Sequence, residues 1–85
     1  MNKTVVWDEV KRRANIAKHG LDFADLTIGF FATAISIDAG DGRRKAVGRF
    51  ADGTIVVVYV ELGTQGIGVI SMRRASRKER RLIDA

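Results

Sequence analysis

Residues 54–61 constrain the fold most, because they form the most β-favouring run in the chain. They read Thr-Ile-Val-Val-Val-Tyr-Val-Glu, in which β-branched and aromatic side chains follow one another. Apolar side chains on both faces of a strand indicate burial on both faces, so we expect this strand at the centre of a sheet. Asp52 and Gly53 precede it and are a dipeptide typical of hairpin turns, which predicts pairing with a strand at residues 44–50.

The segments around the central strand predict an α+β architecture. Asp8 and Asp22 each precede a helix-like segment and can accept a hydrogen bond from its first backbone N–H groups. Gly20 supplies the left-handed residue that commonly ends a helix, so the first helix should end there. Further strands are expected at residues 3–7, 34–38 and 67–73, and a terminal helix from residue 75 or 76 to about residue 83.

We therefore predict a single α+β domain over residues 1–85. Two N-terminal helices should pack on one face of a mainly antiparallel, twisted sheet of about four strands, followed by a basic C-terminal helix. Gly48 indicates a bulge or a close approach of the backbone within its strand. The predicted core residues are Phe23, Leu26, Ile28, Phe30, Ile55, Val57, Ile70 and Met72.

The basic residues gather at the two ends of the chain. Lys and Arg number 15 against 10 Asp and Glu, a net charge of +5. Residues 72–85 carry six basic and two acidic groups, and residues 1–20 carry five and two, whereas residues 21–71 carry four and six. If the ends meet in space, they form one basic surface that attracts phosphate without reading base sequence. Nucleic acid, an anionic membrane surface and an acidic protein all fit as partners, and a charged helix that only confers solubility is the alternative.

The composition also bears on cofactors and location. The chain has no Cys, so neither disulfides nor thiolate zinc sites can form, which suits the reducing cytoplasm where we expect the protein. With one His and scattered acidic residues, we expect no metal and no cofactor. No apolar run approaches the ~20 residues that span a bilayer, and the first residues do not form a signal peptide.

Lys18 and His19 stand at the expected end of the first helix. The helix dipole favours positive charge there, and imidazole groups titrate near neutral pH, so His19 could transfer a proton. The alternative is a capping histidine that only binds the last carbonyl groups of the helix.

Ser71 and Arg73 lie in the last expected strand. Strict alternation would place Val69, Ser71 and Arg73 on one face, and Ile70 with Met72 on the other, which suits a core. Arg73 would then stand at the sheet surface beside a hydroxyl group. Because a guanidinium matches a phosphodiester better than any other side chain, this pair is a candidate phosphate site. An ordinary surface arginine at the end of a strand is the alternative.

The terminal helix adds further basic side chains. Arg77 shares one helical face with Arg80 and Arg81, which follow one turn later. Glu79 in this helix and Glu61 at the end of the central strand are candidate bases. Glu79 could equally neutralise its basic neighbours.

The order of these residues resembles the BrnT family of bacterial toxins, the toxin half of type II toxin–antitoxin pairs. The resemblance covers nearly the whole chain with compatible gaps. Arginines that are usual in the family at two positions are replaced here by Leu62 and Gly68. The matching positions are Trp7, Asp8, Lys11, Asn15, Lys18, His19, Gly20, Phe23, Ile70, Ser71, Arg73, Ala75, Glu79 and Arg80.

The resemblance implies a RelE-like α+β fold and a metal-independent endoribonuclease that inhibits translation and growth. We expect the neighbouring 2′-hydroxyl to attack the scissile phosphate in line, while the protein positions the RNA, moves protons and offsets charge. We assign Arg73 and Arg80 to phosphate stabilisation, and His19 or Glu61 to proton transfer. Lys18, Ser71 and Arg77 are the candidate RNA-binding residues.

The alternative function is a catalytically weak or inactive paralogue that acts as a basic module for binding nucleic acid or protein. The replacement of two family arginines by Leu62 and Gly68 favours this alternative. An active toxin should arrest growth when it is produced alone, whereas a pure binder should leave cellular RNA intact.

The resemblance also implies neutralisation by a BrnA-type antitoxin with a ribbon-helix-helix domain. We expect a 2:2 heterotetramer that contacts operator DNA only through the antitoxin, and no membrane partner. An acidic inhibitor would be attracted to the terminal helix and would compete with RNA for the same charges. The predicted antitoxin-binding residues are Arg74, Arg77, Lys78 and Arg81.

Overall fold

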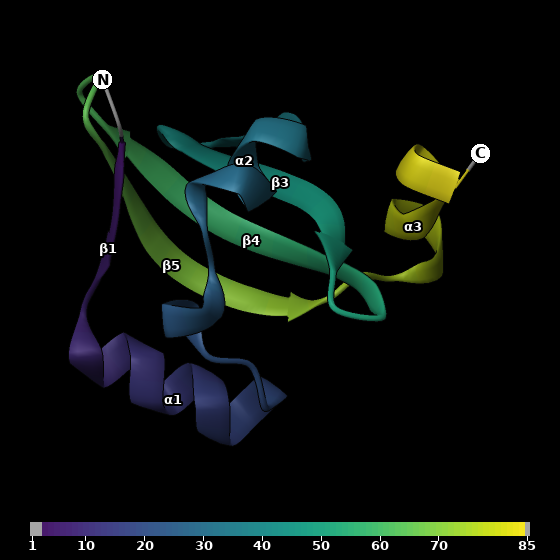
Figure 1. The fold of residues 1–85 in the computed structure, drawn as a ribbon, viewed down its shortest axis with the longest axis horizontal. Coiled ribbons are helices and arrows are strands. Elements are labelled where there is room, and N and C mark those ends of the chain that lie inside the picture. Colours follow the sequence, from purple (N-terminus) through teal and green to yellow (C-terminus); the bar gives the residue numbers. More distant parts are fainter. Residues whose placement is uncertain (1–2, 85) are drawn as a thin grey trace.

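The computed structural model describes residues 3–84, which form five strands, three α-helices and one short 3-10 helix (Figure 1). The N-terminal elements are β1 (Thr4–Trp7), α1 (Glu9–His19), the 3-10 helix η1 (Phe23–Asp25) and α2 (Ile28–Thr33). They are followed by β2 (Ile35–Gly40), β3 (Arg43–Phe50), β4 (Gly53–Leu62), β5 (Gly66–Arg74) and α3 (Arg77–Asp84). The predicted α+β class is confirmed.

β4 is the central strand of the sheet, whose order is β1-β5-β4-β3-β2. The pairs β2–β3, β3–β4 and β4–β5 are antiparallel, and β1 pairs with β5 in parallel. The composition of residues 54–61 predicted the central position of β4, and the order of elements along the chain predicted a mainly antiparallel sheet. The predicted number of about four strands is too low for the described residues, because residues 4–7 join the sheet as a fifth strand at its edge.

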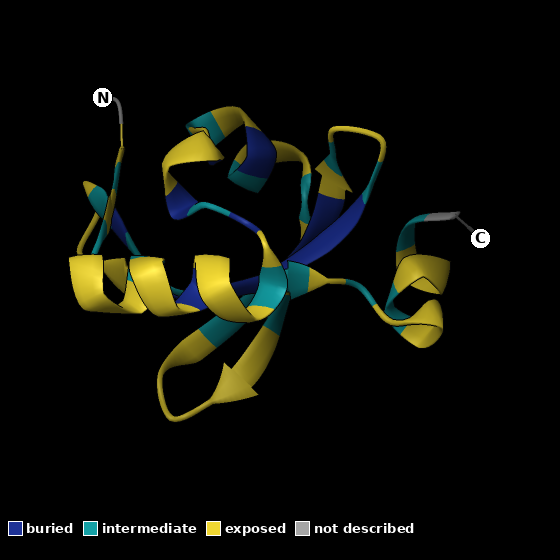
Figure 2. Ribbon diagram, turned by 90° about the horizontal axis from the view of Figure 1, so that it is seen from below, coloured by how far each residue is buried: buried dark blue, intermediate teal, exposed yellow. Residues whose placement is uncertain are grey.

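The main core lies on one face of the sheet, beneath the segment that contains η1 and α2 (Figures 1 and 2). Of the predicted core residues, Ile28 and Ile70 are only half-buried, and the other six are buried. The opposite face, here called the outer face, buries Val47 and Val56 outside the main cluster. The main cluster comprises Leu21, Phe23, Leu26, Phe30, Ala46, Ile55, Val57, Tyr59, Ile67, Val69 and Met72.

Gly48 lets α2 approach β3 closely. A Cβ atom at this position would lie 2.8 Å from Cε1 of Phe30 and 3.1 Å from Cβ of Ala34. These separations are shorter than ordinary van der Waals contact, so any larger residue would displace the Phe30 ring. The close approach that the sequence predicted at Gly48 is confirmed.

The segment after α1 forms two short helices instead of the single helix predicted from Asp22. The side chain of Asp22 accepts a hydrogen bond from the backbone of Ala24, and the side chain of Thr27 accepts one from Phe30. Two N-caps within six residues start two helices, and Leu26 between them has extended backbone angles. None of the helices in residues 3–84 has the length and apolar character needed to cross a bilayer.

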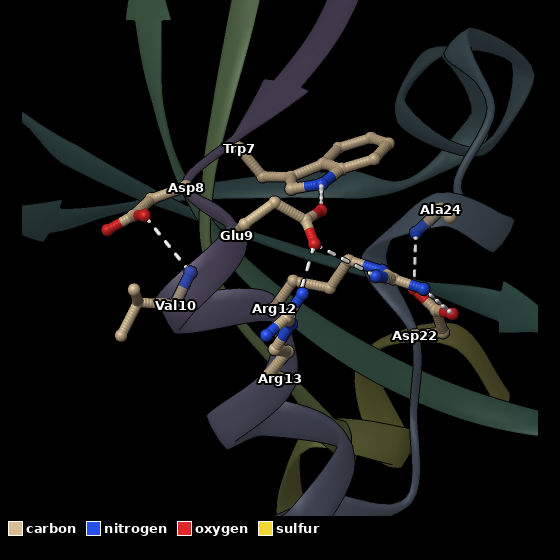
Figure 3. Close-up of polar contacts among 8 residues, drawn as sticks. All are labelled: Trp7, Asp8, Glu9, Val10, Arg12, Arg13, Asp22 and Ala24. Atoms are coloured by element: carbon tan, nitrogen blue, oxygen red, sulfur yellow. Dashed lines mark hydrogen bonds and ion pairs between the residues drawn. The ribbon is translucent and has the colours of Figure 1, made fainter.

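Arg12 attaches α1 to the chain that follows it (Figure 3). Its Nε and Nη2 atoms donate to the two carboxylate oxygens of Asp22 at 2.8 and 2.9 Å, and Nη1 donates to Glu9 at 3.1 Å. Glu9 also accepts a hydrogen bond from the indole of Trp7 at 2.9 Å, so β1 joins the network. Hydrogen bonds from Arg12 lower the pKa of Asp22, and the bond from Trp7 is the largest cause of a lowered pKa at Glu9.

A β-bulge in β5 changes which side chains face the core. Val69 pairs with Tyr59, but Ser71 pairs with Val58, so Ile70 is an extra residue in the ladder. The predicted strict alternation is therefore wrong. Val69 and Met72 share the core face, while Ser71 stands on the outer face. Arg73 follows Ser71 by two residues and also stands on the outer face, as predicted.

Asn15 supports β5 just beyond this bulge. β1 pairs with β5 only as far as Val69, so the backbone edge at Met72 has no strand beside it on that side. The side chain of Asn15, buried to 6% exposure, fills this position. It accepts from the N–H of Met72 at 3.0 Å, and its amide donates at 2.9 Å to the carbonyls of Met72 and Leu21. One side chain thus replaces a neighbouring strand and fixes the end of α1.

We expect Asn15→Leu to lower the free energy of unfolding by about 2–4 kcal/mol, because it leaves one buried donor and two buried acceptors unpaired. Urea unfolding followed by far-UV circular dichroism measures the change. The control is Lys11→Leu on the exposed side of α1, which should change stability by less than about 0.5 kcal/mol. Equal stability of the Asn15→Leu variant and the wild type would contradict the role assigned to Asn15.

Candidate active site

One carboxylate attaches α3 to the outer face of the sheet. Glu79 accepts hydrogen bonds from both terminal nitrogens of Arg73, at 2.7 and 2.8 Å. Lys45 on β3 donates to the same carboxylate at 3.3 Å. The Glu79 side chain is 14% exposed, whereas those of Arg73 and Lys45 are 35% and 32% exposed. Glu79 therefore links β3, β5 and α3.

The same carboxylate begins the helix. The backbone N–H of Ser76 donates to Glu79 at 2.8 Å, and the hydroxyl of Ser76 accepts from the N–H of Glu79 at 3.1 Å, which together form a capping box. The hydrogen bonds from Arg73, followed by those from Ser76, hold the pKa of Glu79 well below its usual range. A carboxylate that holds its proton so weakly is a poor general base, so the base role considered for Glu79 is not supported.

A basic pocket lies where the β3–β4 turn, the end of β5 and α3 meet. Its volume is about 530 Å³. Arginines from three elements line it: Arg49 of β3, Arg74 of β5 and Arg80 of α3, and Asp52 supplies the one carboxylate among the lining residues. The remaining lining residues are Ala51, Gly53, Thr54 and Ala75. With three guanidinium groups against one carboxylate, the pocket suits an anion.

The structure brings the predicted residues of the first helix near this end of the sheet. Asn15 lies beside Met72, and the four residues from Asn15 to His19 advance about 6 Å along α1. The last turn of α1, with Lys18 and His19, therefore lies level with the end of β5 (Figure 1). Lys18 is exposed and His19 is half-buried.

Glu61 lies apart from the other candidate catalytic residues. Arg73 pairs with Val56 of β4, and Glu61 follows Val56 by five residues in the same strand. Glu61 and Arg73 are therefore about 16 Å apart along the strand direction. The pairing also places Glu61 on the core face of the sheet and Arg73 on the outer face. Glu61 lines a separate pocket of about 220 Å³ with Lys3, Ile28, Phe31, Ala32, Tyr59 and Ile67. The structure does not bring Glu61 together with Arg73 and Arg80.

The two positions where the resemblance leads us to expect arginine lie side by side. A Cβ atom on Gly68 would be 3.1 Å from Cγ2 of Val60 and 3.4 Å from Cδ1 of Leu62. The side chain of Leu62 thus packs over Gly68 on the outer face. An apolar contact therefore stands at the two positions where the resemblance leads us to expect arginines, whereas Arg49, Arg74 and Arg80 gather at the end of the sheet near α3.

The predicted antitoxin-binding residues form an exposed basic surface around α3. Arg74 also lines the basic pocket. Arg74, Arg77, Lys78 and Arg81 are all exposed, and in Figure 2 most of α3 is exposed to solvent. The RNA-binding candidate Arg77 begins the same helix, and Ser71 lies two residues before Arg73 on the outer face.

The sequence analysis missed Lys45 and Arg49 in β3. Both stand on the outer face, because they pair with Val58 and Thr54. The alternation of Arg43, Lys45 and Arg49 around Val47 was a usable signal for a basic face of this strand. Within residues 3–84, the acidic and histidine side chains form no group of three that could hold a metal ion.

We expect Glu79→Gln to destabilise the protein more at pH 6 than at pH 3. A carboxyl whose pKa is lowered by folding stabilises the native state fully above its ordinary value of 4.5, and that contribution is lost as the pH falls toward the folded value. The free energy of unfolding of wild type and variant, measured at about pH 6 and about pH 3, should therefore converge at the lower pH.

The control for this measurement is Glu61→Gln, which changes an exposed carboxylate at the other end of β4. It should alter stability at pH 6 by less than about 0.5 kcal/mol. A difference between wild type and Glu79→Gln that is the same at both pH values would show that the ion pairs of Glu79 do not hold α3.

Comparisons with known proteins identify the family of this chain. The sequence profile of the family described as "Ribonuclease toxin, BrnT, of type II toxin-antitoxin system" matches residues 7–79. The crystal structure of the ribonuclease toxin BrnT of Brucella abortus is similar, with a TM-score of 0.84 and 44% sequence identity. That match covers 89% of this chain and 100% of the Brucella chain. A comparison with curated proteins gives no match. The chain belongs to the BrnT family of ribonuclease toxins of type II toxin–antitoxin systems.

Proposed function

We propose that this chain is an endoribonuclease whose RNA-binding surface lies at the end of the sheet covered by α3. The observation that carries the proposal is the basic pocket, into which three different elements each contribute an arginine. An RNA backbone presents one phosphate per nucleotide, and guanidinium groups bind phosphate with two parallel hydrogen bonds. Family membership supports the substrate class, since the family is one of ribonuclease toxins.

The reaction we propose needs no metal, because the nucleophile belongs to the substrate. The 2′-oxygen attacks the adjacent phosphorus and loses its proton to a base, while the bond from phosphorus to the 5′-oxygen breaks and that oxygen takes up a proton. The products are a 2′,3′-cyclic phosphate and a 5′-hydroxyl. The protein holds the reacting atoms in line and offsets the negative charge of the phosphorane.

Arg80 is the residue we assign to phosphate stabilisation. It is exposed and lines the basic pocket together with Arg74 and Arg49. Arg73 has a different position, because both of its terminal nitrogens bind Glu79. We therefore propose that Arg73 positions α3, and through it Arg80, in place of the direct phosphate contact predicted from the sequence.

We assign the other predicted site residues to the surface around the basic pocket. Lys18, Ser71 and Arg77 are proposed to bind the RNA backbone on either side of the cleaved phosphate. For proton transfer we propose His19, which ends α1 near this end of the sheet and whose imidazole ring can both donate and accept a proton. Glu61 is not retained as an alternative to His19, because it lines a separate pocket on the other face.

A second candidate function is a binding module without catalysis. The packing of Leu62 over Gly68 favours it, since this apolar contact stands where the resemblance leads us to expect two arginines. Such a protein would bind nucleic acid or an acidic partner through the same basic pocket. Production of the chain alone distinguishes the candidates: a ribonuclease arrests translation and growth and degrades cellular RNA, whereas a binder does not.

An antitoxin partner is implied by membership in a type II toxin–antitoxin family. We propose that it is of the BrnA type, with a ribbon-helix-helix domain, and that a 2:2 heterotetramer binds operator DNA through the antitoxin. We further propose that the fold is RelE-like and that the toxin acts in the cytoplasm. Acidic groups of the antitoxin would cover the basic residues of α3 and compete with RNA.

We expect Arg80→Ala to lower the rate of RNA cleavage by about 10²–10³, because one preorganised charge donor is lost from the transition state. The measurement is single-turnover cleavage of a labelled RNA in EDTA, in which the wild type should keep full activity. The matched control is Arg43→Ala, which removes an exposed arginine at the start of β3 and should cleave at the wild-type rate. Wild-type activity in Arg80→Ala would contradict the assignment of this residue.

We expect the double variant Arg77→Glu with Arg81→Glu to bind the antitoxin at least about tenfold more weakly, because it reverses two charges on the exposed surface of α3. The adjacent open reading frame is co-expressed, and the affinity of the purified proteins is measured by calorimetry. The control Lys11→Glu with Arg43→Glu makes the same change in net charge on α1 and β3. If both double variants bind alike, the basic helix is not the inhibited surface.

A further inference from the structure

An apolar groove lies between the tip of α3 and the β2–β3 side of the sheet. Its volume is about 330 Å³, and it is lined by Thr33, Ile35, Gly48, Arg49, Leu82 and Ile83. Ile35 and Leu82 are 39% and 47% exposed. Single exposed aliphatic residues are common on protein surfaces, but here two of them line the same hollow beside a highly charged helix.

This groove adjoins the basic pocket. Arg49 lines both hollows, so a ligand that fills the groove reaches the edge of the pocket that contains Arg74 and Arg80. Arg81 precedes Leu82 directly in α3 and adds positive charge near the groove. The combined surface therefore offers an apolar hollow on one side and guanidinium groups on the other.

The lining of the groove suits a protein side chain better than RNA. Single-stranded RNA is bound through bases that stack on aromatic side chains, and the groove has no aromatic residue among those that line it. Aliphatic walls instead match an aliphatic or aromatic side chain of a polypeptide. The arginines beside the groove match carboxylates in the same polypeptide.

We propose that the groove is an anchor site for the antitoxin. A segment of that protein inserts an apolar side chain between Ile35 and Leu82 and directs a neighbouring carboxylate toward Arg74 and Arg80 in the basic pocket. The insertion supplies affinity that salt does not screen, and the carboxylate covers the basic pocket. This inference rests on the proposed function in one respect, since covering the pocket inhibits the toxin only if RNA binds there.

The test compares Leu82→Gln with Leu62→Gln. Both substitutions replace a half-exposed leucine, 47% and 49% exposed, by a neutral polar residue of similar length. Leu82 lines the groove. Leu62 is the last residue of β4, and it lies about 30 Å along that strand from Gly53, the first residue, which lines the basic pocket. Affinity for the protein encoded by the adjacent open reading frame is measured by calorimetry at about 0.15 M and about 0.5 M salt.

We expect Leu82→Gln to weaken binding roughly tenfold or more at both salt concentrations, which is the effect of one buried leucine, and Leu62→Gln to change it less than about twofold. RNA cleavage by Leu82→Gln should equal that of the wild type. Equal affinity of the two variants would overturn the proposal, as would a Leu82-dependent dimer of this chain in sedimentation. A loss of RNA cleavage in Leu82→Gln would assign the groove to the substrate.

The test distinguishes failure of the anchor site from failure of the proposed ribonuclease activity. If the wild type does not cleave RNA but Leu82→Gln still weakens antitoxin binding, the anchor site stands and the ribonuclease assignment fails. If the wild type cleaves RNA and Leu82→Gln binds the antitoxin as tightly as wild type, the anchor site fails and the ribonuclease assignment stands.

Discussion

The hydrogen bonds between the Asn15 side chain and the backbone of Met72 are the constraint on which the rest of the structure depends. They join residues 57 positions apart and are buried, so water cannot replace them if they break. They lie just beyond the bulge at Ile70, where β5 has passed the end of β1 and needs a partner along its open edge. Asn15 supplies that partner at Met72, while on the other edge β5 stays paired with β4 as far as Arg74. The same contact fixes the last turn of α1 beside the end of the sheet.

The position of α3 follows from this ordered strand end. Among the residues that the structure describes, α3 contributes none to the main core cluster, and its Glu79 carboxylate binds Arg73 and Lys45 of the sheet. Removing either partner of such a half-buried ion pair leaves the other charge without a counter-charge. Glu79 also completes the capping box at the start of α3. The element that carries Arg80 into the basic pocket is thus placed by charge, while the sheet beneath it is placed by apolar packing. We infer that Glu79 positions α3 and does not act as a base, because its hydrogen bonds leave it unsuited to accept a proton.

Most of the fold could be predicted from the sequence, because the signals were local. The valine-rich run at residues 54–61 and the cap at Asp8 specify their elements within a few residues of chain. The bulge at Ile70 could not be predicted, since it depends on how β5 pairs with a strand that is itself placed by other contacts. The candidate site was predicted only in part, because some of its contacts are also not local in the sequence. The basic residues of α3 were visible as a cluster in the sequence, but the pairing of Arg73 with Glu79, and the distance of Glu61 from both, are properties of the assembled sheet.

Leu62 and Gly68 lie in contact at the two positions where the family resemblance leads us to expect arginines. A Cβ atom at residue 68 would lie 3.1 Å from Cγ2 of Val60, which is a tight contact, and 3.4 Å from Cδ1 of Leu62, which is an ordinary van der Waals contact. A larger residue at position 68 therefore requires a small shift of Val60. Conversely, a glycine at residue 68 leaves a hollow that an aliphatic side chain at residue 62 fills, which removes apolar surface from water. With Leu62 and Gly68 in place of arginines, the outer face carries less positive charge at this end, whereas Arg49, Arg74 and Arg80 of the basic pocket lie at the other end of the sheet.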